Sequence, residues 1–251
     1  MSYFNGSGVA TSYAASRPYF HPLVIERLPA RLGVSRLPLA LDVACGTGQS
    51  TSALLALAAR VVGTDFSSDM LAAAGPSPRI DLVAANAEEL PFAPGAFPLL
   101  TVALAFHWFD RARFLREAQR VLAPGGWLVI YNNAFFGQMR GNPAFEEWLT
   151  GTYLARYPSP PRDRQPFTDT DAAEFGFDFV ERETYQNVVE FSREELVRYL
   201  MTQSNIIAAV NAGHERYGAV EEWLTQQLQP LFQSERATFV FGGTIWYLRK
   251  R

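Results

Sequence analysis

Two carboxylates and a glycine-rich loop are the residues of this sequence best suited to binding a ligand. Asp42 precedes a small-residue loop that contains Gly46 and Gly48, and Asp65 ends the next apolar segment. Glycine lets a backbone approach a ligand closely. A carboxylate such as that of Asp65 can accept two charge-assisted hydrogen bonds from a sugar diol. Asp42 would repel a pyrophosphate, so the pattern favours a ligand with cationic or hydrogen-bond-donating groups.

Two known glycine-rich loops do not match this stretch. The dinucleotide fingerprint G-x-G-x-x-G requires a third glycine for close helix packing, and Thr51 stands in its place. A phosphate-binding P-loop is excluded because no Gly-Lys-Ser/Thr follows. S-adenosylmethionine fits better, because it offers an amino-acid end, a sulfonium and a ribose diol without phosphate. A nicotinamide-dependent oxidoreductase and a non-catalytic binding module remain as alternatives.

His107 is the strongest single candidate for proton transfer. It follows a long apolar segment and precedes Trp108. A neutral imidazole can take a proton from a hydroxyl group, whereas a carboxylate acceptor is already ionised at neutral pH and needs no base. Cys45 has no visible base beside it, so we interpret it as a small packing residue.

These residues need elements that bring them together. Apolar segments at 39–44, 60–65, 79–86, 97–109 and 127–133 predict strands, and the patterns at 52–59, 67–74 and 110–122 predict helices between them. Such alternation predicts a parallel sheet with helices on both faces. Asp42, Asp65, Asn86 and His107 all fall at carboxyl ends of strands, where such sheets bind ligands.

The second half of the chain is less regular. We predict a helix over 142–157, two strands within 175–191, helices over 192–202 and 214–232, and a strand pair or one bent strand over 237–251. Ser192 is suited to capping the helix that follows it. The middle helices are expected to form a cover inserted before the last strands.

Composition narrows the function classes further. The chain has 251 residues and a formal net charge of −3, which gives no electrostatic case for nucleic acid. Cys45 is its one cysteine, so no internal disulfide is possible, which is compatible with the cytoplasm. We find no signal peptide and no apolar run long enough to span a membrane. The three histidines are far apart in sequence, so no metal site is expected.

Five motifs, in order, carry a resemblance to a known family. LDVACGTGQS, VVGTDFSSDML, ANAEELPF, FHWF and LAPGGWLVI resemble the successive motifs of class I S-adenosylmethionine-dependent methyltransferases. The branch with ubiquinone-biosynthesis and trans-aconitate methyltransferase-like enzymes is the most similar. The resemblance covers about residues 35–133 and implies an α/β fold with a Rossmann-like, seven-stranded, mostly parallel sheet, helices on both faces and a helical cover insertion. Its last strand would be antiparallel.

The resemblance also implies a domain plan. Residues 1–251 would form a single methyltransferase domain, with a cofactor-binding core over 35–133, an N-terminal lid over 1–34 and a cover and substrate region over 134–235. The reaction would be methyl transfer to a small molecule, at oxygen of a carboxylate or hydroxyl group, or alternatively at carbon of a quinone or lipid-like acceptor. The oligomeric state cannot be read from the sequence.

Site residues follow from the same resemblance. Asp42, Gly46 and Gly48 would line the methionine part, Asp65 would take the ribose, and Phe66 and Met70 would flank the adenine. The cofactor-binding set is completed by Ala44, Thr47, Asn86, Ala87, Glu88, Ala105 and Phe106, with Asn86 and Ala87 at the adenine edge and Ala105 or Phe106 near the sulfonium. The family often has glycine at the position of Ala44, and the small alanine is tolerated there if φ is negative. Tyr13, Arg17, Trp108 and Arg140 are the candidate substrate-binding residues, the two arginines because a guanidinium recognises carboxylates.

Overall fold

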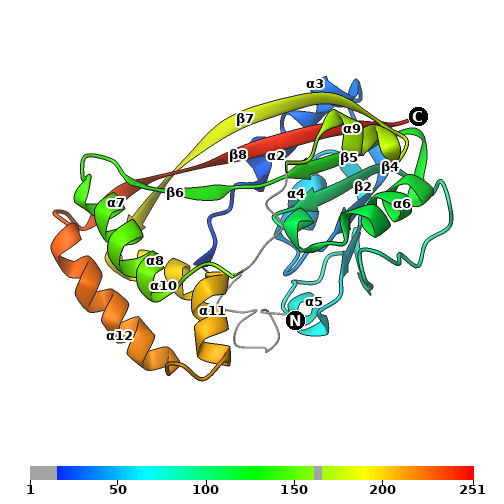
Figure 1. The fold of residues 1–251 in the computed structure, drawn as a ribbon. Coiled ribbons are helices and arrows are strands. Elements are labelled where there is room, and N and C mark those ends of the chain that lie inside the picture. The colour runs from blue at the N-terminus through cyan, green and yellow to red at the C-terminus, as the bar shows by residue number, and fades with distance from the viewer. Residues whose placement is uncertain (1–15, 161–165) are drawn as a thin grey trace. The chain divides into compact units, whose positions relative to one another are not determined.

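The fold is that of a computed structural model, and it is described for residues 16–160 and 166–251 (Figure 1). These residues fall into two compact units. One contains Tyr19–Asn133, residues 166–185 and Gly243–Arg251, and is called the sheet unit below. The other contains residues 16–18, 134–160 and 186–242, and is called the helical unit. The strands β7 (Phe177–Ser192) and β8 (Arg236–Lys250) belong in part to each.

The sheet unit contains most of the regular alternation of strands and helices. Its elements are α2 (His21–Ile25), α3 (Leu28–Leu32), β1 (Leu37–Val43), α4 (Gln49–Leu54), β2 (Ala58–Asp65), α5 (Ser68–Ala72), β3 (Ile80–Ala84), β4 (Phe97–Ala103), η1 (Phe106–Trp108), α6 (Arg111–Val121), β5 (Leu122–Tyr131) and α9 (Asp169–Glu174). Asp110 caps α6 by accepting the Arg113 N–H, and Ser67 caps α5.

The strands form a mostly parallel sheet. The hydrogen-bonded order is β3-β2-β1-β4-β5-β8-β6, and β7 pairs with β8. Strands β1 to β5 are parallel to their neighbours, and β8 (Arg236–Lys250) runs antiparallel to β5. The Rossmann-like fold with an antiparallel last strand is therefore confirmed. The predicted strand number is wrong, because the sheet has eight strands instead of seven.

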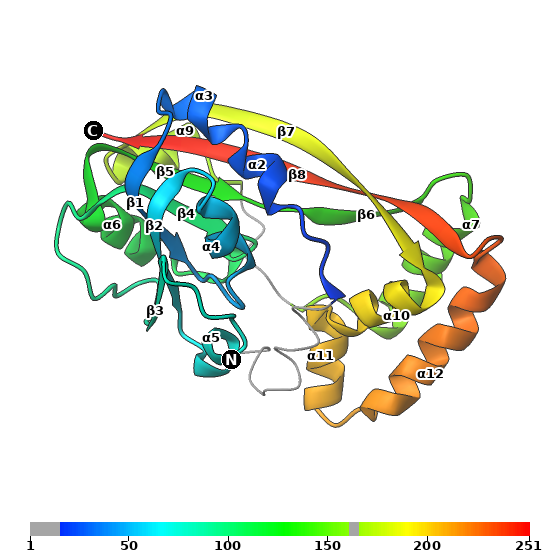
Figure 2. The same ribbon diagram turned by 180° about the vertical axis from the view of Figure 1, so that it is seen from behind.

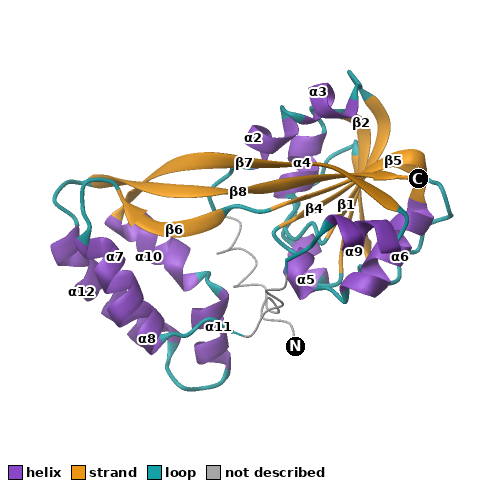
Figure 3. Cartoon of the chain, turned by 45° about the horizontal axis from the view of Figure 1, so that its top comes forward, coloured by secondary structure: helices purple, strands orange, loops and turns teal. Residues whose placement is uncertain are grey.

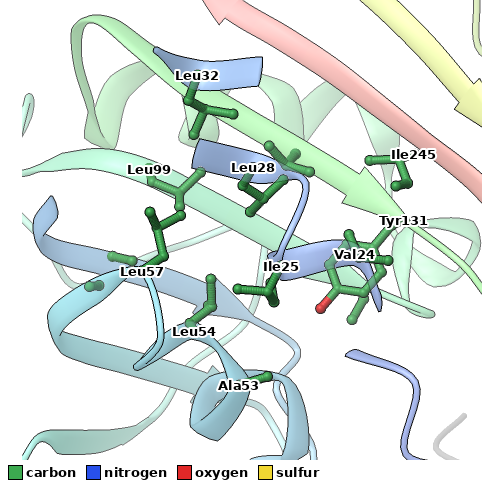
Figure 4. Packing of buried hydrophobic residues seen from close by; sticks show 14 of the residues in the cluster. Val24, Ile25, Leu28, Leu32, Ala53, Leu54, Leu57, Leu99, Tyr131 and Ile245 are labelled. Atoms are coloured by element: carbon green, nitrogen blue, oxygen red, sulfur yellow. The ribbon is translucent and has the colours of Figure 1, made fainter. Parts of the chain in front are cut away.

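Side-chain alternation places a hydrophobic core on each face of the parallel strands. Leu99 and Val129 pack with α2, α3 and α4, whereas Leu100 and Leu128 pack with α6 on the opposite face. Figure 2 shows α2, α3 and α4 together on one side of the strands. In the first of these cores, Val24, Leu28 and Tyr131 are almost completely buried (Figure 4).

A histidine is buried beside this core. His21 is 5% exposed, and its Nδ1 lies 3.1 Å from the hydroxyl of Tyr131 at the end of β5. Phe20 packs against the same ring, with 4.3 Å between the centroids. Burial disfavours the imidazolium, so it lowers the pKa of His21 from 6.5 to about 3.

The buried His21 predicts a pH dependence of stability. The His21 imidazole is protonated below about pH 6.5 in the unfolded chain, but only below about pH 3 in the folded chain. The free energy of unfolding therefore falls as the pH falls from 6.5 to 3. The contribution of His21 to the free energy of unfolding should decrease by about 1 kcal/mol as the pH is lowered from 7 to 5.5. Urea unfolding of His21→Phe should show a pH dependence smaller by this amount. His214→Phe, in an exposed turn, is the control, and an unchanged pH dependence in His21→Phe would contradict the assignment.

The helical unit is built around an aromatic core. It contains β6 (Ala134–Met139), α7 (Ala144–Trp148), a π-helical turn η2 (Leu149–Tyr153), α8 (Leu154–Arg156), α10 (Arg193–Met201), α11 (Ser204–Asn211), α12 (Tyr217–Leu228) and η3 (Gln229–Leu231). Figure 3 shows how largely helical this unit is. Phe145, Phe239 and Phe241 are at most 1% exposed within the core. Ser192 caps α10 through a reciprocal capping box with Glu195, as predicted.

Several predicted elements of the second half are wrong. Residues 175–191 were expected to form two strands, but β7 is one strand over Phe177–Ser192. The short strand β6 was not predicted, nor was α11. For the region 237–251 the structure has the second of the two predicted alternatives, a single long strand, β8. Strand β5 begins at Leu122 and includes the Ala-Pro-Gly-Gly turn signal, which produces a register shift against β4.

Within residues 16–160 and 166–251, every helix is too short or too polar to cross a membrane.

Candidate functional site

Asp42 is the centre of a buried hydrogen-bond network at the end of β1. Its side chain is fully buried and accepts hydrogen bonds from the hydroxyls of Ser50 (2.6 Å), Thr51 (2.7 Å) and Thr101 (2.8 Å). Register explains the third, because Asp42 lies opposite Thr101 in the β1–β4 pair. Burial raises the pKa of Asp42, and the three hydroxyls oppose that shift. The carboxylate thus ties β1 and β4 to the first turn of α4.

The other neighbour of Asp42 has no side chain. Gly63 lies opposite Asp42 in the β1–β2 pair. A Cβ at Gly63 would lie 2.9 Å from the Cys45 Sγ and 3.0 Å from the Thr51 Oγ1, so only glycine fits here. Cys45 is buried, and burial, followed by the charges of Asp42 and Asp65, raises its thiol pKa. This environment agrees with a packing role for Cys45, because a nucleophilic cysteine needs a lowered pKa.

The loop between β1 and α4 turns twice through the left-handed region. Gly46 has φ = 57° and Gly48 has φ = 79°, and Gly48 is the N-cap of α4. Helix α5 packs against the loop through Met70. A Cβ at Gly46 would lie 3.2 Å from the Met70 Cε. Met70 is therefore a buried supporting residue, whereas Phe66 is 55% exposed. Thr47 is partly exposed between the two glycines.

Asp65 holds this loop in place from the end of β2. Its Oδ2 accepts the Gly46 N–H at 2.9 Å, and its Oδ1 accepts the Ser67 N–H at 2.9 Å. Burial raises its pKa, and the backbone N–H groups oppose the shift. Each carboxylate oxygen has a second lone pair. Asp65 can therefore organise the loop and still accept hydrogen bonds from a ligand.

Ala44 does not meet the condition of a negative φ under which alanine replaces glycine without strain. Its φ is 56°, in the left-handed region. Leu104, at the end of the neighbouring strand β4, has φ = 60°. A positive φ costs an L-residue about 1–2 kcal/mol, and such strain concentrates at ligand sites. The chain turns sharply after both β1 and β4, and Ala44 adopts the turn that a glycine would make without strain.

Ala44→Gly should therefore stabilise the protein. Relief of the left-handed strain outweighs the extra flexibility that glycine gives the unfolded chain, so the free energy of unfolding should rise by about 0.5–1 kcal/mol. Urea unfolding measures the difference. Ala53→Gly, inside α4, is the matched control and should lower the free energy of unfolding by about 1 kcal/mol. A loss of stability in both variants would show that position 44 is unstrained.

The segment after β3 carries the residues predicted at the adenine edge. Asn86 and Glu89 form an isolated β-bridge that closes a tight turn, and Asn86 is exposed. Ala87 packs against the core on the α6 side. A side-chain oxygen of Glu88 accepts the backbone N–H of Asp110 at 3.0 Å, so this carboxylate links the segment to the start of α6.

The end of β4 leads into the short helix η1. Ala105 is its N-cap, and Phe106 is 5% exposed within an aromatic cluster that includes Phe167 and Trp246. The Phe106 ring is thus a core side chain. His107 is partly buried, its ring 4.6 Å from that of Trp108, which is 38% exposed.

The predicted substrate residues are divided between the two units. Arg17 and Arg140 belong to the helical unit, whereas Trp108 belongs to the sheet unit. Arg17 donates from Nη2 to the carbonyl of Thr202 at 2.7 Å and stacks over the Tyr199 ring. Arg140 is exposed, and its backbone N–H pairs with Thr238. Tyr13 lies outside the described residues.

Sequence reasoning missed the hydroxyl partners of Asp42. Ser50 and Thr51 stand eight and nine residues after Asp42, in the first turn of α4, and that spacing after the glycine loop was the available signal. Thr101 required the strand register. The Tyr131–His21 pair required the packing of α2.

The residues at this end of the sheet fit a phosphate-free adenosine derivative. Two buried carboxylates flank a loop whose residues 44–49 include no lysine or arginine, which disfavours a pyrophosphate. Asp65 retains acceptor capacity toward a diol. Among residues 16–160 and 166–251, no group of three or more His, Cys, Asp or Glu side chains could hold a metal ion.

Comparison with known proteins agrees with this geometry. Residues 41–130 match the family model described as a methyltransferase domain. An uncharacterized methyltransferase of Mycobacterium bovis is 32% identical over 179 residues, which cover 67% of each chain. A demethylmenaquinone methyltransferase of Corynebacterium kroppenstedtii is 44% identical over 91 residues, 36% of this chain and 39% of that protein.

A solved structure has a similar fold over nearly the full length. A protein from Anaeromyxobacter dehalogenans, assigned as a type II methyltransferase, has a TM-score of 0.68 and 22% identity, covering 92% of this chain and 95% of that chain.

Proposed function

Because this chain belongs to the class I S-adenosylmethionine-dependent methyltransferases, we propose that it methylates an oxygen atom, of a carboxylate or a hydroxyl group, on a small-molecule acceptor. Membership in this family argues against the alternative of a nicotinamide-dependent oxidoreductase. The cofactor is S-adenosylmethionine. The observation that carries the cofactor site is the pair of buried acids, Asp42 and Asp65, on either side of the glycine loop.

We assign the cofactor to the loop and to the strand ends beside it. Asp65 would accept the ribose hydroxyls, and the backbone of residues 44–48 would lie along the methionine part. Asp42 supports this loop from beneath through its three hydroxyl partners. Asn86, Ala87 and Glu88 would read the adenine. The bound cofactor supplies a methyl group on a sulfonium, which is a good leaving group.

The protein then has to orient the acceptor and exclude water. Displacement requires the acceptor atom about 3–3.5 Å from the methyl carbon, and a dry site strengthens the electrostatics. His107 would accept the proton of a hydroxyl acceptor and would be unnecessary for a carboxylate. Its place just after β4, beside the half-exposed Trp108, supports this role.

Carbon methylation of a quinone is the second candidate. The 44% identity to a demethylmenaquinone methyltransferase over 91 residues favours it. That match covers only 36% of this chain and 39% of the other protein, so most of both chains lies outside it.

Labelled-methyl transfer tests both candidates. The purified full chain is incubated with methyl-labelled S-adenosylmethionine and, separately, with carboxylic acids, phenols and a demethylated quinone. Mild alkali distinguishes the products, because it releases labelled methanol from a methyl ester but not from a phenol ether or a C-methyl group. Alkali-labile label, or alkali-stable label on a phenol oxygen, supports the proposal. Label only on quinone carbon overturns it in favour of the second candidate.

A His107 variant separates the two oxygen acceptors. With a phenol, His107→Gln should lower kcat by about 100-fold and remove the fall of kcat at acidic pH, because a protonated imidazole cannot accept the proton. With a carboxylate it should change kcat little. His214→Gln serves as the control. Unchanged phenol methylation by His107→Gln would remove His107 from the mechanism.

A further inference from the structure

Helix α6 holds the segment after β3 by its charged side chains. Leu90 donates its N–H to the Glu117 Oε2 at 2.8 Å, and Gly95 donates its N–H to the carbonyl of Arg120 at 2.9 Å. The guanidinium of Arg120 donates from Nη2 to the Leu90 carbonyl at 2.8 Å and from Nη1 to the Phe92 carbonyl at 2.6 Å. The backbone of residues 90–95 is therefore bonded to one turn of α6.

Glu117 and Arg120 also bind each other. The Arg120 Nε and Nη2 donate to the two Glu117 oxygens at 2.8 Å and 2.7 Å, a bidentate arrangement across one helical turn. The hydrogen bond from Arg120 lowers the pKa of Glu117, which keeps the pair ionised. A surface ion pair alone contributes little to stability. What distinguishes this pair is that both members also bond the backbone of another segment.

The bonded segment continues directly from the residues assigned to the adenine. Asn86 is paired with Glu89, and Leu90, the next residue, is 4% exposed and held by both side chains. A second link joins Glu88 to the N-cap of α6. Residues 86–88 therefore contain one attachment to α6, at Glu88, and are followed two residues later by a second, at Leu90. Hydrogen-bond recognition of a base requires a preset geometry, because a misplaced group loses the bond.

We propose that Glu117 and Arg120 are positioning residues that fix residues 86–88 for recognition of the adenine edge, an inference that rests on the cofactor site proposed above. Neither residue needs to touch the cofactor. Their effect is on selectivity for the base, because adenine and hypoxanthine present opposite hydrogen-bonding groups at positions 1 and 6.

Calorimetric titration with two compounds tests the proposal. S-adenosylhomocysteine and S-inosylhomocysteine differ only in the base. The wild-type protein should bind the adenine compound at least about tenfold more tightly. Arg120→Gln should weaken adenosyl binding by about tenfold while changing inosyl binding by no more than about twofold. Arg113→Gln, an exposed arginine of the same helix, should retain wild-type selectivity.

A charge-swapped variant separates positioning from stabilisation. Glu117→Arg combined with Arg120→Glu restores an ion pair on α6, but a glutamate at 120 cannot donate to the carbonyls of Leu90 and Phe92. We expect its thermal midpoint to approach that of wild type while selectivity stays low. Glu117→Gln, which keeps the side-chain shape, should show a smaller loss of selectivity if Arg120→Gln does not fold.

The outcomes are distinct. Equal weakening of both compounds, or full recovery of selectivity in the charge-swapped variant, would show a purely structural pair and overturn the proposal. A wild-type protein that binds both compounds equally would show that residues 86–88 do not read the base, which also overturns it. Failure of the wild type to bind either compound would instead overturn the cofactor site itself.

Discussion

Asp65→Ala is expected to bind S-adenosylmethionine about 100-fold more weakly than the wild-type protein. The substitution removes the carboxylate assigned to the ribose hydroxyls, and each charge-assisted hydrogen bond contributes about 1.5–3 kcal/mol. It also leaves the N–H groups of Gly46 and Ser67 without their acceptor, so the glycine loop loses its anchor. Calorimetry with S-adenosylmethionine and with S-adenosylhomocysteine measures the loss.

Two further variants sharpen this result. Asp65→Asn keeps the volume, but one side of an amide is a donor and would face an N–H group, so it should also bind weakly. Asp81→Ala removes an exposed carboxylate at the edge strand β3, where it pairs with Arg60, and should bind normally. Wild-type affinity in Asp65→Ala would refute the ribose assignment.

The second large effect is expected on stability. Asp42→Ala should lower the free energy of unfolding by about 3 kcal/mol, because three buried hydroxyls lose a charged acceptor. Thr51 and Thr101 are both 0% exposed, so water cannot replace the carboxylate as their hydrogen-bond acceptor. Urea unfolding gives the change, and calorimetry should show weakened cofactor binding because α4 and the loop are released.

Single hydroxyl deletions provide the matched comparison. Thr101→Val keeps the shape and removes one donor, so it should cost about 1–2 kcal/mol. Ser50→Ala should have a similar effect. If Asp42→Ala were as stable as wild type, the hydrogen bonds of Asp42 to the strand ends and to α4 would contribute nothing to the free energy of unfolding.

The chemistry-bearing ends of β1 and β2 could be predicted from sequence because their signals are local. An apolar run followed by an acid and a turn residue marks the end of a buried strand, and Asp42 and Asp65 are found at those positions. The Ser192 capping box is equally local. Strand and helix alternation over residues 39–131 was enough for the parallel sheet, because that period is set by the chain itself.

The long strands were beyond the reach of a local pattern. The alternation in Phe177–Ser192 is compatible with one strand or with two, and pairing with β8 decides for one. The segment Ala134–Met139 is too short for its sequence pattern to predict a strand. It forms β6 because it pairs with β8 from Gly242 to Phe239.

The sequence by itself determined where the candidate ligand-binding residues stand along the chain: an acid before the glycine loop and an acid at the end of the next strand. Only the tertiary structure decided what those residues touch. Asp42 meets Thr101 because β1 and β4 are in register, Ala44 takes φ = 56° because the chain must turn into α4, and Arg120 reaches Leu90 because α6 packs beside that segment. Strand ends follow from patterns along the chain, whereas contacts between distant segments depend on register and packing, which no local pattern specifies.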